Sequence, residues 1–310
     1  MIEADKKNAV FFLPYEENDL DEKRGAIATW VNKVNDHLDV KIPVYSLSGI
    51  RGAGLYLDFL VFLRYIPYFR RFGNWAYRKL FSKYASKLDV AYVHNDVAVV
   101  QLLNSQRCKV VLHMHNDYPN VISQYKELIN ERVSVLVVCS KFLENRVVAQ
   151  GVRCPVEVVP NGCEVTESNP VKEYEYCFVG RFDRNKGVKV FLDFLSQNRT
   201  KICSARARVC VVCATGGADR LYKFWQLCRI FLLKRYRGIE IDLRSHASHN
   251  AIQSILRSSE FLFVPTLYRE AFGMVALEGM ASGAMVVSSN VGGLAEVVPY
   301  AGFAWSFEHQ

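Results

Sequence analysis

The chain has 310 residues and a formal net charge of +8, with 50% hydrophobic and 23% charged residues. It is too long for one small domain and too apolar for a disordered chain, so two globular domains are expected. No segment of the sequence reaches the roughly 18 uninterrupted apolar residues of a membrane-spanning helix, and the polar start from Met1 to Lys7 is unlike a secretory signal, so a cytoplasmic protein is expected.

Short runs rich in Val, Ile, Phe and Tyr alternate with segments of helical length along the whole sequence. Strands are expected at 9–14, 42–47, 90–94, 109–115, 134–140, 156–160, 174–180, 208–214, 239–243, 261–265 and 285–289. Helices are expected at 23–37, 141–150, 188–198, 218–234, 248–257 and 274–282. Several strand runs are almost continuously apolar, as strands buried on both faces are, so the alternation predicts parallel sheets with helices on both sides. A polar stretch at 162–173 predicts the boundary between two doubly wound α/β domains, residues 1–162 and 163–310.

The segment from Leu55 to Leu88 concentrates positive charge and aromatic rings. It carries seven basic residues against one acid, together with eleven aromatic residues. This mixture suits an anionic membrane surface, and it equally suits an ordinary helix with its aromatic rings inward and its cations in water. Single-stranded nucleic acid is the least favoured partner. A second basic run, 223–237, is expected to extend the same face.

The cysteines point to a reduced interior. There are nine of them, an odd number, and several lie in Val-rich runs. This pattern predicts free thiols that fill the core, and Cys210 and Cys213, although spaced as a CxxC, are interpreted in the same way because they fall inside one strand-like run.

A glycine-bounded basic loop follows the first strand of the second domain. The strand is expected to end at Gly180, and Arg181 and Lys186 precede Gly187, where a helix starts. Two cations next to a helix N-terminus can hold a diphosphate, and the alternative is a solvated basic turn.

The strongest motif runs from Phe261 to Gly283. Glu270 lies in the loop after a strand and Glu278 lies eight positions later inside a helix, with Gly273 between them. A loop carboxylate can accept hydrogen bonds from sugar hydroxyls, and one inside the helix can reach a ribose diol. Glu278 lies among Val275, Leu277 and Met280, and a partly buried acid needs a partner.

The sequence resembles the retaining glycosyltransferases of family 4, group 1, in these two motifs. The resemblance extends to three further segments: Val159-Pro160-Asn161-Gly162, His113-Met114-His115-Asn116 and Asn290-Val291-Gly292-Gly293. Arg24-Gly25-Ala26 and the histidine motif are most similar to the lipopolysaccharide-core N-acetylglucosaminyltransferases. The resemblance implies the GT-B fold, in which two Rossmann-like domains face a central cleft. It also implies that residues 1–162 bind the acceptor and 163–310 the nucleotide sugar. Because family members continue well past the last motif, the C-terminal domain is expected to be truncated.

The resemblance also assigns roles to single residues. It implies that Arg181 and Lys186 bind the donor diphosphate and that Glu270 orients the sugar, helped by the backbone of Ala271, Phe272, Gly273 and Met274. It further implies that Glu278 holds the ribose, that His115 faces the sugar from the other domain, and that Gly25 lets the first loop approach the donor.

The implied activity is metal-independent transfer of a sugar, N-acetylglucosamine as the best choice, from a UDP-sugar to a lipopolysaccharide-core or other glycolipid or polysaccharide acceptor. No cofactor and no nucleic acid is expected, and the protein is expected at the cytosolic face of the inner membrane. Two alternatives stay open: a GT-B sugar-nucleotide epimerase, and a truncated, non-catalytic protein that keeps only its membrane association. Asp19-Leu20-Asp21 is interpreted as solvated surface, and His113 and His115 share one side of a strand without an apparent third metal ligand.

Overall fold

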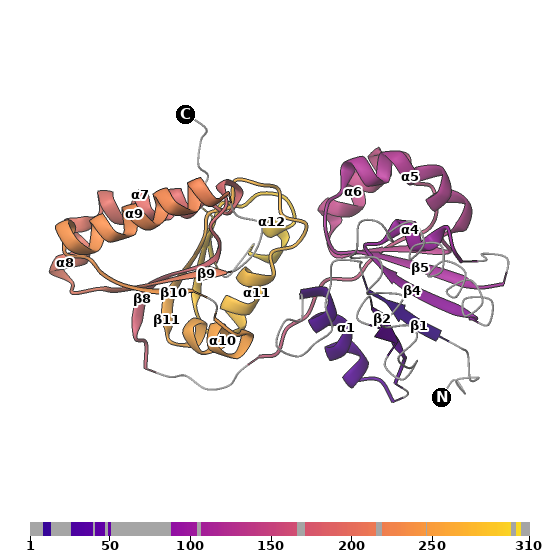
Figure 1. Ribbon diagram of the computed structural model, residues 1–310, viewed down its shortest axis with the longest axis horizontal. Helices are drawn as coiled ribbons and strands as arrows, with labels where there is room; N and C mark the ends of the chain where they lie inside the picture. Colours follow the sequence, from indigo (N-terminus) through magenta and orange to yellow (C-terminus); the bar gives the residue numbers. More distant parts are fainter. Residues whose placement is uncertain are drawn as a thin grey trace, which may run out of the picture. The chain divides into compact units, whose positions relative to one another are not determined.

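The computed structural model describes residues 9–13, 26–39, 41–46, 49–50, 88–103, 107–165, 171–214, 219–245, 247–298 and 302–304. The chain forms two compact units, Met1–Val159 and Pro160–Gln310 (Figure 1). The sequence placed the boundary a few residues later, after Gly162. Gly25, Asp19-Leu20-Asp21 and, except for Leu88 itself, the segment from Leu55 to Leu88 lie outside the described residues.

The first unit is built on a sheet with the strand order β3-β2-β1-β4-β5-β6-β7. Neighbouring strands are parallel except for β2 and β3, which are antiparallel. The strands are β1 (Ala9–Phe12), β2 (Val44–Ser46), β3 (Gly49–Ile50), β4 (Val90–His94), β5 (Lys109–Met114), β6 (Val135–Val138) and β7 (Val156–Val158).

Helices cover both faces of this sheet. The helices are α1 (Ala26–Asp36), α4 (Val97–Val100), α5 (Pro119–Arg132) and α6 (Lys141–Ala149). Helix α1 packs Ile27, Ala28 and Val31 against Phe11 of β1, and Figure 1 shows α4, α5 and α6 on the other side of the sheet. Because successive strand residues point to opposite faces, Tyr92 and His94 of β4 lie on the α1 side.

The second unit holds an all-parallel sheet with the order β10-β9-β8-β11-β12-β13. Its strands are β8 (Tyr174–Arg181), β9 (Arg208–Ala214), β10 (Glu240–Ser245), β11 (Ser259–Val264), β12 (Met285–Ser288) and β13 (Gly302–Ala304). The helices are the short 3-10 helix η1 (Arg184–Lys186), α7 (Val188–Gln197), α8 (Arg199–Ser204), α9 (Arg220–Arg237), α10 (His249–Arg257), α11 (Met274–Ala281) and α12 (Leu294–Val297).

Strand β9 shows why this sheet is buried on both faces. Val209, Val211 and Cys213 pack into the core beneath α7, α8 and α9, whereas Cys210 and Val212 pack into the core beneath α10 and α11. The two cysteines of the CxxC therefore lie on opposite faces of the sheet and cannot share a metal ion or a disulfide. All nine cysteines are free thiols, so the prediction of core-filling thiols is confirmed for these two.

The predicted fold class, two parallel-sheet α/β domains, is confirmed. A helix was predicted at 248–257, and Ser248 caps the observed α10, since its side chain accepts a hydrogen bond from the Ala251 N–H. Helix α5 is not among the segments predicted from the sequence. It buries few side chains, Ile122 and Ile129 among them, so its apolar periodicity is weak, and Pro119 at its first turn is the main local signal. Among the described helices, none is both long and apolar enough to cross a bilayer.

Candidate functional site

The strand order of the second unit reverses next to its first strand. From β8 the chain proceeds to β9 and β10 on one side and then returns to β11 on the other. In parallel α/β sheets ligands bind at such a switch point, just beyond the carboxyl ends of the strands. The two loops that flank it here are the ones after β8 and β11, and they carry the two motifs singled out in the sequence.

The loop after β8 is a tight turn organised by Asp183. Its carboxylate accepts hydrogen bonds from the N–H groups of Asn185 and Lys186, both at 3.0 Å, and so caps η1. The same carboxylate forms an ion pair with Arg181, with Nε and Oδ2 3.4 Å apart. Asp183 thereby fixes the backbone that carries both predicted cations.

The two loops are joined through their backbones. The Asn185 carbonyl accepts hydrogen bonds from the Leu267 N–H at 2.8 Å and from the Thr266 hydroxyl at 2.9 Å. Gly187 has a φ of +72°, and a Cβ there would lie 1.8 Å from the Pro265 carbonyl oxygen. Only glycine fits this approach, because any side chain would separate the loops.

The central contact of the site joins Lys186 to Glu270. Lys186 Nζ lies 2.5 Å from Glu270 Oε1, and the two side chains are 30% and 18% exposed. Glu270 is itself fixed by its backbone, since its carbonyl accepts the Gly293 N–H at 2.7 Å. The Lys186 ammonium group and the Glu270 carboxylate can separate when a ligand binds. The lysine can then donate to phosphate oxygens, and the carboxylate can accept hydrogen bonds from hydroxyl groups.

Helix α11 begins a few residues beyond Glu270. Its N-cap is Gly273, at a φ of +107°, and this glycine has no side chain with which to cap the helix start. Its first turn therefore offers backbone N–H groups and the positive end of the helix dipole to an anion. The half-buried Glu278 lies four residues after Met274, the first residue of α11, and thus just over one turn into the helix.

The structure thus brings Arg181, Lys186 and Glu270 together around one pair of loops, followed by Ala271, Phe272, Gly273 and Met274 at the start of α11. Ala271 and Phe272 are buried. All these residues belong to the second unit.

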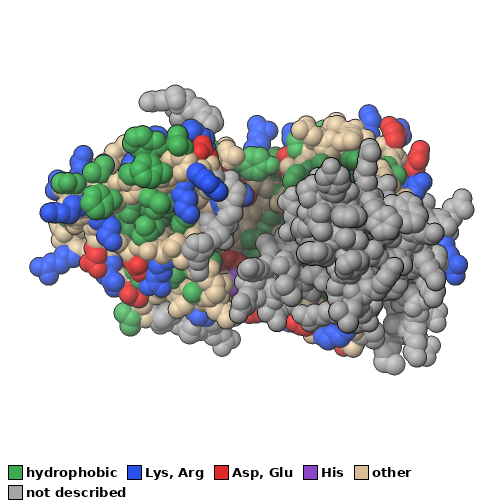
Figure 2. All heavy atoms as spheres, in the orientation of Figure 1, with side chains coloured by type: hydrophobic (Ala, Val, Ile, Leu, Met, Phe, Trp, Pro, Cys, Tyr) green, Lys and Arg blue, Asp and Glu red, His purple; other side chains and the backbone are tan. Residues whose placement is uncertain are grey.

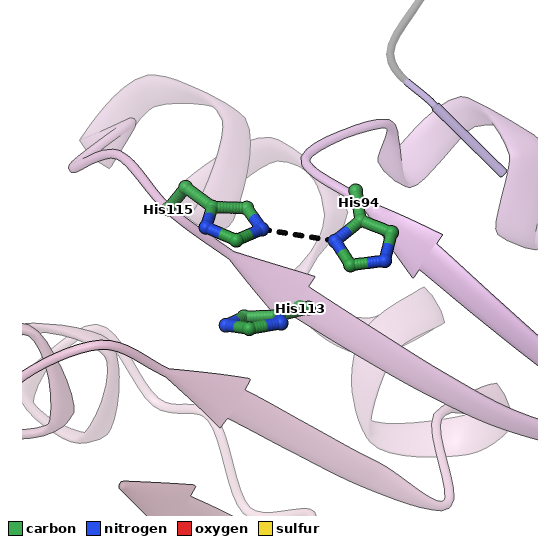
Figure 3. A group of neighbouring side chains, drawn as sticks. All are labelled: His94, His113 and His115. Carbon is green, nitrogen blue, oxygen red and sulfur yellow. Dashed lines mark hydrogen bonds between the residues drawn. The ribbon is translucent and has the colours of Figure 1, made fainter. Parts of the chain in front are cut away.

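A separate group of side chains lies at the carboxyl ends of β4 and β5 in the first unit: His94, His113 and His115 (Figure 3). His94 Nδ1 and His115 Nε2 share a hydrogen bond of 2.9 Å, and the rings of His113 and His115 stack with centroids 4.0 Å apart. Trp30 of α1 packs its ring against all three, closest to His113 at 4.8 Å.

Burial keeps these imidazoles neutral. Desolvation lowers the pKa of His113 to about 4. It also lowers the pKa values of His94 and His115 well below 6.5, with a smaller contribution from the neighbouring imidazoles. The Nε2 atoms of His94 and His113 are buried without a hydrogen-bond partner among the described residues. His115 is therefore available as a neutral hydrogen-bonding group rather than as a cation.

His94 is the site residue that the sequence analysis missed. It supplies the third imidazole that was not apparent there, and one ligand atom from each ring lies within 4.8 Å of the others. The signal was available, because the sequence predicted that His94 ends one strand and that His113 and His115 end the next. In the structure His94 pairs directly with His113. The 2.9 Å between His94 and His115 is shorter than the about 3.3 Å between nitrogen ligands of a tetrahedral zinc ion, so the rings as they stand form a hydrogen-bonded stack.

Two family models match the chain. The model described as "Glycosyl transferases group 1" matches residues 165–302, and the one described as "Glycosyltransferase Family 4" matches residues 43–167. The lipopolysaccharide 1,2-N-acetylglucosaminetransferase of Salmonella typhimurium is 24% identical over 283 residues, which are 86% of this chain and 70% of that protein. A D-inositol 3-phosphate glycosyltransferase of Corynebacterium jeikeium is 30% identical over 159 residues, 46% of this chain and 37% of the relative, so the chain spans well under half of that protein.

Solved structures share the fold at low identity. HepE of Anabaena in complex with UDP-glucose aligns with a TM-score of 0.69 and 16% identity, over 96% of this chain and 85% of that one. Sucrose-phosphate synthase of Thermosynechococcus elongatus aligns with a TM-score of 0.64 and 18% identity, over 93% and 82%. The two family models together span residues 43–302 and both units have the matching fold, so the chain carries a family 4 glycosyltransferase domain followed by a group 1 glycosyltransferase domain.

Proposed function

We propose that this protein is a retaining glycosyltransferase that moves N-acetylglucosamine from its UDP-sugar to a lipopolysaccharide-core or other glycolipid or polysaccharide acceptor. The observation that carries the proposal is the contact between Lys186 and Glu270 at the switch point of the second sheet. The name of the Salmonella relative supports the choice of sugar and acceptor, and the UDP-glucose complex of HepE supports the choice of a UDP donor.

In this proposal, Lys186 leaves its ion pair with Glu270 when the donor binds, and forms an ion pair with the donor diphosphate instead. Breaking the bond between the sugar and the diphosphate places negative charge on the leaving group, and Lys186, Arg181 and the N–H groups at the start of α11 stabilise that charge. These positive groups supply the electrostatic stabilisation for which other enzymes recruit a metal ion, so donor cleavage is proposed to need none.

Glu270 and Glu278 then bind the donor on the two sides of the diphosphate, at the sugar and at the ribose. Glu270, once released by Lys186, accepts hydrogen bonds from sugar hydroxyls, and the backbone from Ala271 to Met274 holds the sugar from the adjacent side. Glu278 accepts from the ribose diol. Both acids are held on rigid elements, Glu278 on α11 and Glu270 by its backbone bond to Gly293, so that hydroxyl recognition costs little ordering of the protein.

His115 contributes from the carboxyl end of β5. As a neutral imidazole, hydrogen-bonded to His94, it is proposed to bond a hydroxyl of the transferred sugar. Gly25 is proposed to lie in the loop that approaches donor and acceptor, and the segment from Leu55 to Leu88 to hold the protein at the cytosolic face of the inner membrane, close to a lipid-linked acceptor.

Calorimetry with UDP tests the phosphate site directly. Arg181→Ala is expected to weaken UDP binding at least tenfold, and undiminished binding would discredit the phosphate role. A donor screen with a core oligosaccharide, run beside Glu270→Ala and with EDTA, tests sugar choice and metal independence. Proton NMR of the product reports whether the anomeric configuration is retained, and conversion of the donor without acceptor would identify an epimerase instead.

A further inference from the structure

Helix α9 presents apolar side chains to solvent near its start and near its end. Its inward stripe, made of Tyr222, Gln226, Ile230 and Leu233, is buried against the sheet and α7. On the opposite side Leu221 is 71% exposed, Trp225 is 61% exposed and Tyr236 is 70% exposed. The full set of exposed apolar side chains is Leu221, Phe224, Trp225, Phe231, Leu232 and Tyr236.

The spacing of these residues makes them one stripe. Leu221 and Trp225 are four residues apart, as are Leu232 and Tyr236, and Phe224 and Trp225 lie seven residues before Phe231 and Leu232, so the six share one broad face of the helix. From Leu221 to Tyr236, at about 1.5 Å per residue, the stripe is about 23 Å long. Figure 2 shows hydrophobic side chains gathered on the surface over α9 with Lys and Arg side chains around them.

The charge of the helix has one sign. Its sequence, RLYKFWQLCRIFLLKRYR, contains six basic residues and no acid. Of these, Arg229 is engaged with Asp193 at 2.5 Å. Helix α8 adds the exposed Arg199 and Lys201 beside the end of α9, where Arg199 Nε donates to the Arg237 carbonyl at 2.8 Å. A long apolar stripe is thus bordered by cations on flexible stems.

We propose that α9 is a docking helix that lies in the surface of an anionic lipid bilayer. Aromatic and Leu side chains on one face enter the boundary between head groups and acyl chains, while Lys and Arg extend sideways to the lipid phosphates. The same basic residues exclude a transmembrane orientation of this helix. A second copy of the chain is the weaker candidate, because two such faces would bring like charges together.

This surface is independent of the donor site. It belongs to the second unit, and its apolar face was not part of the membrane interpretation of the sequence, which depended on the segment 55–88 and the basic residues of 223–237; it requires no catalytic activity. Its test therefore succeeds or fails without reference to the proposed sugar transfer.

The experiment is sedimentation of the full chain with sucrose-loaded vesicles, either of phosphatidylcholine alone or with one quarter phosphatidylglycerol. We expect binding to the anionic vesicles that weakens with salt, and at least tenfold weaker binding for the double variant Phe224→Ser, Trp225→Ser. The matched control is Val148→Ser, because Val148 is a 53% exposed apolar residue of the first unit; this variant is expected to bind like the wild type. Circular dichroism and UDP binding verify that each variant is folded.

A second readout places the helix at the membrane. Brominated lipids should quench tryptophan fluorescence in the wild type and quench less in Trp225→Phe, which keeps the apolar face. The proposal is overturned if the wild type ignores anionic vesicles, or if the double variant binds them equally well. It is also overturned if ultracentrifugation finds a lipid-free dimer that the double variant abolishes, since the face would then belong to a second copy.

Discussion

Acidification should destabilise the first unit through its buried histidines. The pKa of His113 is lowered from 6.5 to about 4 by burial, so the unfolded chain binds a proton at this residue in a pH range where the folded chain does not. The stability that this difference contributes is fully present above pH 6.5 and is lost as the pH falls toward 4. Between pH 7 and pH 5 the loss for one such group is about 2 kcal/mol.

Urea unfolding at a series of pH values, followed by circular dichroism, measures this loss. His113→Phe keeps an aromatic ring beside Trp30 and removes the titrating group, so the fall in the free energy of unfolding between pH 7 and pH 5 should be smaller by about 2 kcal/mol. Any constant cost of the substitution cancels, because only the change with pH is compared. His37→Asn, at an exposed histidine of the same unit, serves as the control. An unchanged pH dependence in His113→Phe would refute the reasoning.

Two further predictions follow from local geometry. Gly187→Ala places a Cβ 1.8 Å from the Pro265 oxygen at a positive φ, so it should cost about 3 kcal/mol or more of stability and abolish UDP binding in calorimetry. Gly238→Ala, also at a positive φ but with open space around it, should cost only about 1–2 kcal/mol and keep UDP binding. Cys203 is the exposed cysteine, six others are buried and two are partly exposed, so Ellman's reagent should modify Cys203 fastest in the native protein and this fastest phase should be lost in Cys203→Ser. Rapid modification of more than three thiols would contradict the burial of the other six.

Much of the fold follows from local apolar patterning. The continuous run in β9 predicted a strand buried on both faces, and the structure divides its side chains between two cores. The loop after β8 was recognised because glycines bound a basic segment, and Gly187 is indeed required by the close approach of Pro265. These features are local, so one sequence is enough to find them.

Contacts between distant segments are less accessible to sequence reasoning. The pairing of Lys186 with Glu270 joins residues 84 positions apart, and it depends on β8 and β11 being neighbours, which alternation alone does not specify. His94 was interpreted only as the end of an apolar strand, because the residues that it contacts, His113 and His115, come from the next strand. The basic residues of 223–237 were singled out in the sequence, but the apolar outer face of α9 was not, because the sequence does not show which apolar residues pack against the sheet.

The most direct measurement compares UDP and UDP-N-acetylglucosamine binding by calorimetry to the wild type, Lys186→Met and Lys189→Met. Lys186 pairs with Glu270 at the switch point, whereas Lys189 is an exposed lysine of α7 paired with Asp193. A charge-assisted phosphate contact contributes about 1.5–3 kcal/mol. Lys186→Met should therefore lower the affinity for both ligands by at least about tenfold, while Lys189→Met should change these affinities by less than about twofold. Equal affinities for all three proteins would contradict a diphosphate site between these two loops.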